Sequence, residues 1–328
     1  MSRKIRLLLP KGSLNQPDRG DTSSLIKQAG YNIAGYEPGK ESDKGLIIRN
    51  DPEIEAMLSR PQSAPNELLL GMADVAIVGS DWVQKEANGN GIVEVADLEF
   101  GKTRLVFAVP LSCQKEGLEN FVADQAYLGL ICFTEYVNTA ARAIAATKAY
   151  QGRFSGTEPV RQLRGVSVGD NDRIRVIMSD GVTEGYIKKG ANLVLDNTQT
   201  GSTLTEYGLR ELEQIAESTA RLYASEKAMS DTWKRGKIEE IAAQLRGVVE
   251  ARKRDYVAFN VPNDRLQPML TYLARQELFS DEPTQVPGRN FTQISVLVPK
   301  ARWPKISREL QGYGATNIIR YTPQQVIS

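Results

Sequence analysis

The sequence contains no histidine. This absence excludes nucleophilic catalysis by an imidazole-based triad, and it excludes metal sites built on histidine. The chain has only two cysteines, Cys113 and Cys132, which are too few for a four-thiolate zinc site. The apolar neighbours of Cys132 favour buried free thiols over a disulfide. Any chemistry must therefore use carboxylates, lysine, arginine, hydroxyls, backbone amides or a magnesium ion.

The sequence also lacks an excess of charge and a long apolar run. Lys and Arg number 41 and Asp and Glu number 40, so the formal net charge is +1. No run approaches the ~18 apolar residues of a membrane-spanning helix, and residues 1–10 do not resemble a signal peptide. We therefore expect a cytoplasmic protein that binds neither nucleic acid nor membranes as its main task. A length of 328 residues indicates about two domains and room for a small third one.

In the first 230 residues, short apolar runs alternate with helical stretches. A helix is predicted over residues 138–149, and residues 152–172 are polar and predict a surface loop or hairpin. This alternation favours an α/β fold with helices on both faces of a sheet. The runs that predict strands are 5–9, 73–78, 105–109, 128–133 and 191–195.

The pattern changes after residue 230. Residues 230–253 predict a long amphipathic helix, capped by Ser230 or Asp231, that leads to a separate module at 255–328. The pattern of that module predicts a split βαββαβ sandwich, in which one additional strand lies between the first helix and the strand at 291–298. Its other strands are expected at 256–261, 291–298 and 316–321, and its helices at 263–275 and 302–313.

One motif carries the chemistry: DNTQTGSTL, residues 196–204, lies between a predicted strand and a predicted helix. Gly201 lets the backbone approach an anion closely, and amides near a helix N-terminus point at it. Asp196 can accept hydrogen bonds from ribose hydroxyls or orient a metal-bound water. Thr203 and Glu206 have the spacing of a capping box, so a capped helix without any ligand would also explain these residues.

This motif, with Tyr207 to Glu211 after it, resembles the phosphoribosyl-diphosphate loop of ATP phosphoribosyltransferase, the first enzyme of histidine biosynthesis. The C-terminal module resembles the regulatory domain of the long form of that family, including residues 282–284 and 312–319. The other matching segments follow in the family's order: LPKGSL at 9–14, RPQSAP at 60–65, GMADVAIVGSDWV at 71–83 and LEFGKTRLVFAVP at 98–110.

The resemblance implies a two-lobed catalytic part like a type II periplasmic binding protein, followed by a small ACT-like βαββαβ regulatory domain. Lobe I would comprise residues 1–107 and 206–244, lobe II residues 108–205, and the regulatory domain residues 250–328. The implied reaction joins a ring nitrogen of ATP to the anomeric carbon of phosphoribosyl diphosphate and releases pyrophosphate with the help of Mg²⁺. The family is inhibited by histidine, and its dimers build hexamers.

The resemblance also implies roles for individual residues. Asp196 would face the ribose, while Lys11 and Arg60 would meet the diphosphate as cations; a solvated turn lysine and an exposed helix-end arginine are the alternatives. Gly79 and Asp81 would line the cleft, or merely form a tight turn and a helix cap. No protein ligand to a metal is predicted. The residues expected to hold the 5-phosphate are Thr198, Gln199, Thr200, Gly201, Ser202 and Thr203, and those expected at the histidine site are Thr284 and Ala315.

Several positions depart from the family pattern, and they leave other functions open. A prephenate dehydratase-like enzyme has a similar organisation, but its Thr-Arg-Phe motif is here Thr-Arg-Leu at 103–105. A catalytically inactive ligand-binding relative is the third possibility. The departures are Ser13, Gln62, Ser63, Asn192 and Asn197, of which the first two replace cations that would bind polyphosphate.

Overall fold

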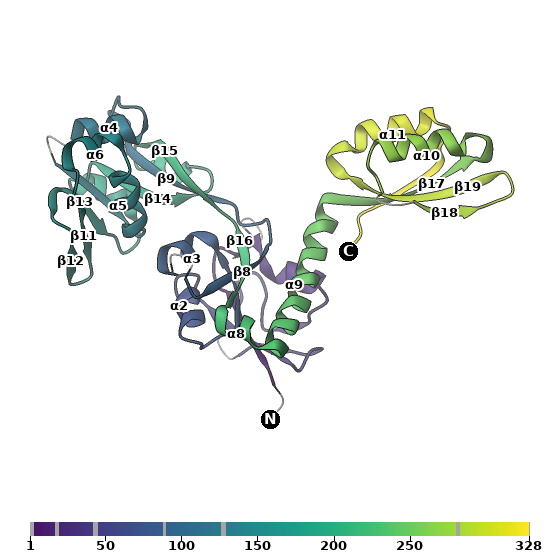
Figure 1. The fold of residues 1–328 in the computed structure, drawn as a ribbon, viewed down its shortest axis with the longest axis horizontal. Coiled ribbons are helices and arrows are strands. Elements are labelled where there is room, and N and C mark those ends of the chain that lie inside the picture. The colour runs from purple at the N-terminus through teal and green to yellow at the C-terminus, as the bar shows by residue number, and fades with distance from the viewer. Residues whose placement is uncertain are drawn as a thin grey trace.

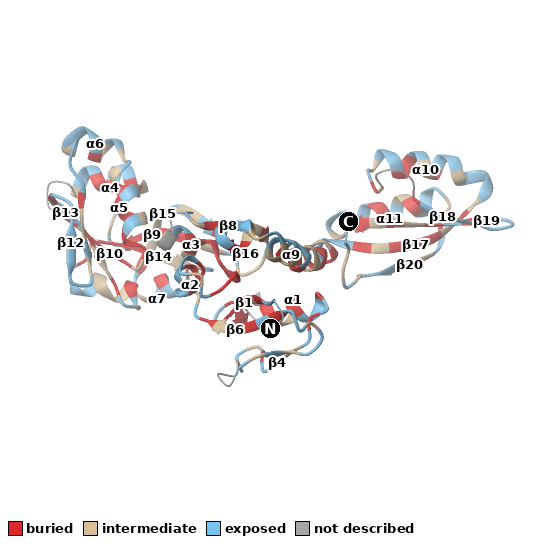
Figure 2. Ribbon diagram, turned by 60° about the horizontal axis from the view of Figure 1, so that its bottom comes forward, coloured by how far each residue is buried: buried red, intermediate tan, exposed pale blue. Residues whose placement is uncertain are grey.

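The computed structural model describes residues 3–16, 20–41, 45–87, 90–125, 129–279 and 283–327. Three separate sheets with their helices form an α/β fold, as the sequence predicts (Figure 1). The buried residues concentrate on the strands and on the inner sides of the helices (Figure 2). Within the described ranges, no helix combines the length and the apolar character that crossing a bilayer requires.

Lobe I is built on a five-stranded sheet of order β6-β1-β7-β16-β8. Helices α1 and α9 cover one face and α2 and α3 the other, because apolar side chains leave both sides of the central strands. The strands are β1 (Ile5–Pro10), β6 (Ile54–Ser59), β7 (Val75–Gly79), β8 (Ile92–Asp97) and β16 (Ala220–Ser225); the helices are α1 (Thr22–Gln28), α2 (Ala64–Leu69), α3 (Ser80–Ala87), α8 (Glu226–Ser230) and α9 (Thr232–Lys253); two small ribbons are β2 (Asn15–Gln16) with β3 (Gly20–Asp21), and β4 (Ile33–Ala34) with β5 (Ile47–Ile48).

Lobe II is built on a seven-stranded sheet of order β12-β11-β13-β10-β14-β9-β15. Helices α4, α5 and α6 cover one face, and α7 with the 3-10 helix η1 packs on the other. The strands are β9 (Thr103–Pro110), β10 (Leu130–Thr134), β11 (Pro159–Leu163), β12 (Val166–Val168), β13 (Asn171–Met178), β14 (Leu193–Thr198) and β15 (Leu209–Ser218); the helices are α4 (Gly117–Gln125), α5 (Val137–Ala145), α6 (Lys148–Phe154), η1 (Thr183–Lys189) and α7 (Ser202–Glu206).

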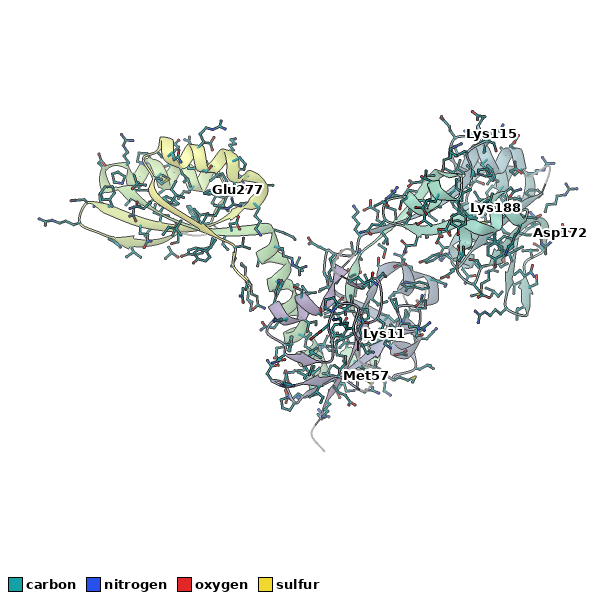
Figure 3. The ribbon with its side chains drawn as sticks, turned by 180° about the vertical axis from the view of Figure 1, so that it is seen from behind. Lys11, Met57, Lys115, Asp172, Lys188 and Glu277 are labelled. Carbon is teal, nitrogen blue, oxygen red and sulfur yellow. The ribbon has the colours of Figure 1, made fainter. Side chains whose placement is uncertain are left out.

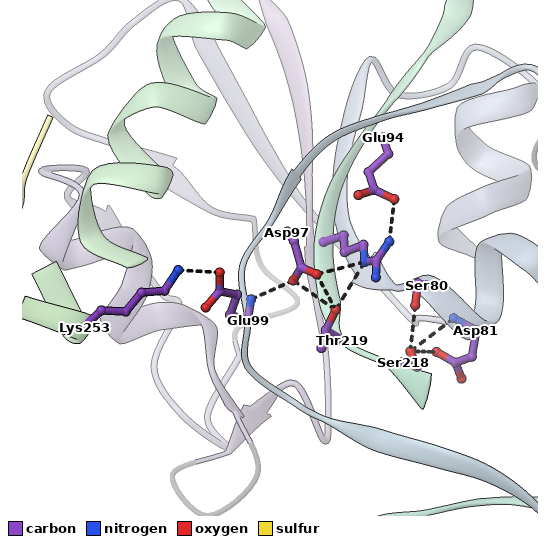
Figure 4. A network of polar contacts seen from close by, with 9 residues as sticks. Ser80, Asp81, Glu94, Asp97, Glu99, Ser218, Thr219 and Lys253 are labelled. Atoms are coloured by element: carbon purple, nitrogen blue, oxygen red, sulfur yellow. Dashed lines mark hydrogen bonds and ion pairs between the residues drawn. The ribbon is translucent and has the colours of Figure 1, made fainter. Parts of the chain in front are cut away.

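Two crossings join the lobes, one between β8 and β9 and one between β15 and β16. Thr219 on the second crossing donates a hydrogen bond to Asp97 on the first, at 2.9 Å (Figure 4). Strands β9 and β15 lie wholly in the sheet of lobe II, so residues 103–107 and 209–218 belong to that sheet and not to lobe I as the sequence boundaries had it. The boundaries implied by the family resemblance therefore move to the crossings, which lie outside these two strands.

The long helix α9 leads from lobe I to the third sheet (Figure 1). It begins at the predicted cap: Asp231 accepts hydrogen bonds from the N–H groups of Trp233 and Lys234. The third module has the predicted order βαββαβ, with both helices packed on one face of the sheet β18-β19-β17-β20. Its elements are β17 (Arg254–Pro262), η2 (Asn263–Arg265), α10 (Leu266–Arg275), β18 (Thr284–Pro287), β19 (Phe291–Pro299), η3 (Lys300–Arg302), α11 (Trp303–Gly312) and β20 (Thr316–Tyr321).

Local predictions fail where side-chain caps decide the boundaries. The helix predicted over 138–149 is two helices, because Thr147 caps a new start by accepting from the N–H of Tyr150. The predicted capping box is also wrong: α7 starts after Gly201, so Thr203 lies inside the helix.

Other local predictions are confirmed. Residues 152–172 contain the β11–β12 hairpin, as predicted. Both cysteines are free, and Glu282 of the matching segment lies outside the described residues.

Candidate active site

A cleft of about 640 Å³ lies between the two lobes. Lobe I contributes the loops after β1 and β6 together with Trp82 of α3. Lobe II contributes the segments after β10 and β13 and the end of β14. The lining residues are Lys11, Gly12, Ser13, Leu14, Arg60, Pro61, Gln62, Trp82, Gly101, Thr103, Glu135, Tyr136, Gly181, Val182, Thr183, Glu184, Asp196, Asn197 and Gln199.

The wall of lobe I carries the two predicted cations. Strands β1 and β6 are parallel, and Pro10 pairs with Ser59 at their carboxyl ends. The next residues, Lys11 and Arg60, therefore leave the same edge of the sheet side by side. The Lys11 N–H is fixed by the carbonyl of Ser59 at 2.9 Å, and Lys11 lies on lobe I in the side-chain view (Figure 3).

The wall of lobe II carries carboxylates. Strands β10 and β14 are parallel, with Thr134 beside Leu195, so Glu135 and Asp196 follow at the same sheet edge. Glu184 lies in the first turn of η1 and reaches the same place. Burial, the largest cause, and the neighbouring charges of Glu184 and Glu135 together raise the pKa of Asp196 to about 7, although the Asn197 N–H stabilises the anion and acts in the opposite direction.

The loop after β14 is the predicted phosphate-binding loop, but only part of it lines the cleft. Gln199 lines the cleft, whereas Thr198, Thr200, Gly201, Ser202 and Thr203 lie beside it. The Gly201 N–H already donates to Thr198 Oγ1 at 2.9 Å, so this amide is paired inside the loop. Among the described residues, the N–H groups of Gln199 and Thr200 have no partner. The accessible donors of the loop are therefore these amides and the exposed hydroxyls of Thr200 and Ser202, which bond each other at 3.0 Å.

Gly201 is required by the backbone of this loop. It has φ +79°, and a Cβ there would lie 2.9 Å from Oε1 of Glu211. The Glu211 carboxylate is held by both terminal nitrogens of Arg104, at 2.6 and 2.7 Å. The arginine thus neutralises an acid that would otherwise repel an anion in the loop.

The predicted cleft residues Gly79 and Asp81 lie behind the surface and do not line the cleft. Gly79 is buried at the end of β7. Asp81 is buried at the start of α3, where Ser218, Tyr136 and Asn197 donate to its two carboxylate oxygens at 2.6, 2.7 and 2.8 Å. A carboxylate with three internal donors is a structural contact, so direct substrate binding by Asp81 is not what this geometry provides.

The two predicted effector residues are far apart within one chain. Thr284 is exposed on β18, which forms one edge of the four-stranded sheet. Ala315 is buried in the core just before β20, which forms the other edge. One module cannot bring both residues to one small ligand.

Sequence reasoning missed much of the lobe II wall. Glu135, Tyr136 and Glu184 line the cleft, and no local motif marks them in the sequence. Val182 has φ +48°, which is unfavourable for a β-branched residue and is typical of a constrained functional segment. The preceding Gly181, also left-handed, was the only local signal of that turn.

Two α/β lobes with a polar cleft between them define a two-lobed ligand-binding protein. The sequence model of the family HisG, described as ATP phosphoribosyltransferase, matches residues 60–247. The ATP phosphoribosyltransferases of Pelotomaculum thermopropionicum and Desulforudis audaxviator are each 30% identical to this chain, and each alignment covers 99% of both chains. The chain therefore belongs to the ATP phosphoribosyltransferase family, which carries out the first step of histidine biosynthesis.

A solved structure of an ATP phosphoribosyl transferase (HisG:HisZ) complex from Thermotoga maritima supports the fold. Its TM-score is 0.52 at 21% identity, and the match covers 75% of this chain and 98% of that chain. The family assignment rejects the prephenate dehydratase-like alternative and identifies the chain as an enzyme.

Proposed function

We propose that the interlobe cleft is where ATP and phosphoribosyl diphosphate react to give phosphoribosyl-ATP and pyrophosphate. The observation that carries this proposal is the division of charge across the cleft. The cations Lys11 and Arg60 come from lobe I, and the carboxylates Glu135, Glu184 and Asp196 come from lobe II. The two lobes are those of the type II periplasmic-binding-protein-like arrangement that the family resemblance implies.

This division suits the charge changes of the transfer. As the bond from the anomeric carbon to pyrophosphate breaks, the sugar gains positive charge and the leaving group gains negative charge. The carboxylates of lobe II would stabilise the sugar, and Lys11 with Arg60 would stabilise the departing pyrophosphate. The cleft would also hold the adenine ring nitrogen in line with the anomeric carbon, which lowers the entropic part of the barrier. No nucleophilic side chain is needed, in agreement with the lack of histidine.

Within the described residues, no cluster of acidic or sulfur ligands has the arrangement that would hold a metal ion. Mg²⁺ prefers to keep water and to bind phosphate oxygens. We therefore propose that Mg²⁺ enters on the polyphosphate of the substrate, where it offsets the repulsion from the three carboxylates.

We further propose that the third module is an ACT-like regulatory domain that binds histidine. Its βαββαβ order and its connection through α9 support this assignment. Because Thr284 and Ala315 lie at opposite edges of the sheet, a site that used both would need modules of two chains. We also propose that the protein is cytoplasmic and that its dimers build hexamers. The proposed domain limits are near 1–107 with 206–244 for lobe I, 108–205 for lobe II and 250–328 for the regulatory domain, with strands β9 and β15 moved to lobe II.

The activity is tested by incubating the full chain with ATP, Mg²⁺ and phosphoribosyl diphosphate. We expect pyrophosphate and an adenine adduct to appear together in equal amounts. The absence of both products, with phosphoribosyl diphosphate left intact, would contradict the reaction proposed for the cleft.

The phosphate loop is tested with a double variant, Thr200→Val with Ser202→Ala. Both hydroxyls are exposed, so their removal should leave the fold intact and weaken phosphoribosyl-diphosphate binding at least tenfold, since two donors to a phosphate are lost. Thr271→Val is the matched control, because Thr271 is an exposed threonine of α10 outside the cleft. Unchanged binding heat in calorimetry of the double variant would contradict the assignment of the loop.

A further inference from the structure

Asp81 is one point at which hydrogen bonds join the two lobes. It starts α3 of lobe I, only 9% of its surface is exposed, and Ser218 at the crossing strand donates to its Oδ1 at 2.6 Å (Figure 4). Its Oδ2 accepts from two residues of lobe II, Tyr136 at 2.7 Å and Asn197 at 2.8 Å. Burying a carboxylate is costly unless several donors surround it, so the arrangement is favourable only when the lobes lie at this separation.

Asn197 is placed to transmit this contact to the cleft. It follows Asp196 in β14, and successive side chains of a strand point to opposite sides. The Asn197 N–H also donates to Asp196 Oδ1 at 2.8 Å. The residue thus bonds Asp81 through its side chain and Asp196 through its backbone.

Aromatic contacts lie beside the same bonds. Trp82 of α3 and Tyr136 of lobe II have ring centroids 5.5 Å apart, and Lys85 Nζ lies 4.4 Å from the Trp82 ring and 5.4 Å from the Tyr136 ring. These contacts between α3 and lobe II shield the Asp81 bonds from water, which strengthens them.

We propose that Asn197 is a positioning residue for the transfer reaction, because its bond to Asp81 fixes the distance between the cations of lobe I and the carboxylates of lobe II. The inference rests on the proposed function of the cleft. It assigns Asp81 and Asn197 a shared role: they hold the lobes at the separation seen in this structure before substrate arrives.

The test is Asn197→Val, which removes the donor at nearly constant volume. We expect KM for phosphoribosyl diphosphate to rise at least tenfold while kcat changes by less than about threefold, because bound substrate can restore the lobe separation by its contacts with both walls. Distances between the lobes can be measured by electron paramagnetic resonance, with spin labels on cysteines that replace the exposed Leu70 of lobe I and Val166 of lobe II in a Cys113→Ser background. Without substrate, Asn197→Val should show a longer and broader distance distribution than the chain that keeps Asn197.

Asn192→Val is the matched control. The Asn192 side chain bonds Gln125, Gly129 and Ile131, all within lobe II, so its loss should lower stability without changing the interlobe distance. The exchange Asp81→Asn with Asn197→Asp keeps an amide opposite a carboxylate, and it should recover most of the KM and the narrow distance distribution.

A distance distribution and KM that stay at wild-type values in Asn197→Val would overturn the proposal. Equal changes in Asn192→Val would overturn it too, since they would reflect general loss of stability. Failure of the proposed function gives a different result: the wild-type chain would form no product, while the distance measurements would still report on the contact between the lobes.

Discussion

Asp196 should give this protein a pH dependence in a range where it has no histidine to titrate. Histidine is the side chain whose ordinary pKa produces charge changes between pH 5 and 8, and the chain contains none. Asp196 has its pKa raised from 3.8 to about 7 by burial and by the charges of Glu184 and Glu135. The substitution Asp196→Asn removes this titration and keeps the shape of the side chain.

The direction in which the free energy of unfolding changes with pH depends on how many protons the folded and unfolded chains bind. Between pH 4 and 7 the folded chain keeps a proton on Asp196 that the unfolded chain has lost, so the free energy of unfolding falls as pH rises. The slope is about 1.4 kcal/mol per pH unit where the difference is one full proton. Solvent in the open cleft screens part of the interaction, and we expect a total loss of about 2 kcal/mol between pH 5 and 7.5. Above that range both states are ionised and the contribution no longer changes.

Urea unfolding followed by tryptophan fluorescence at pH 5, 6, 7 and 8 measures this loss. The difference between the wild-type chain and Asp196→Asn isolates Asp196, because buried carboxylates such as Asp255, whose pKa is lowered, contribute equally to both. The variant should gain stability relative to the wild-type chain as pH rises. Two parallel stability curves would refute the reasoning, as would a carboxyl NMR titration of Asp196 with a midpoint near 4.

Two substitutions test the backbone and the third module. Gly201→Ala should destabilise the chain by about 1–2 kcal/mol because of the left-handed φ, and by a further amount because the new Cβ displaces Glu211. Gly208→Ala, with φ +72° and open space around its Cβ, should lose only the contribution from the left-handed φ. Equal urea midpoints for the two variants would contradict this expectation. Asp255→Asn should lower the free energy of unfolding by about 2 kcal/mol, since the buried carboxylate accepts a hydrogen bond from Arg320 at 2.7 Å. Calorimetry should then show the third module melting at a lower temperature. An unchanged melting profile would show that this ion pair does not stabilise the module.

The fold was predictable where burial sets the pattern. Residues 75–78 of β7 and 105–109 of β9 are apolar because these parts of the strands are covered on both faces. The apolar stripe of α9 likewise matches its buried positions. The lobe boundary was less predictable, because the crossings lie just outside the long strands β9 and β15 and no change of composition marks where one sheet gives way to the other. Residue 107 lies in the middle of β9, where nothing in the local sequence distinguishes one sheet from the other.

The site was predictable only as far as its residues share a local motif. The loop from Asp196 to Leu204 is contiguous, so its composition indicated a phosphate site. The partners of Asp81 are 55, 116 and 137 residues away along the chain, and no spacing rule connects them. Sequence reasoning therefore placed Asp81 on the cleft surface, while tertiary hydrogen bonds bury it behind that surface.

The topology explains why opposite charges face each other here. Each wall of the cleft is the carboxyl edge of parallel strands, β1 with β6 in lobe I and β13, β10 and β14 in lobe II. Residues that directly follow such strands converge at one place whatever their distance along the chain, so a single cation or acid after each strand builds a charged wall. The separation of the two walls then depends on the contacts between the lobes, among which the Asp81 bonds are buried. The chemistry proposed for the cleft depends on both features, because carboxylates too far from Lys11 and Arg60 would stabilise one end of the breaking bond without the other.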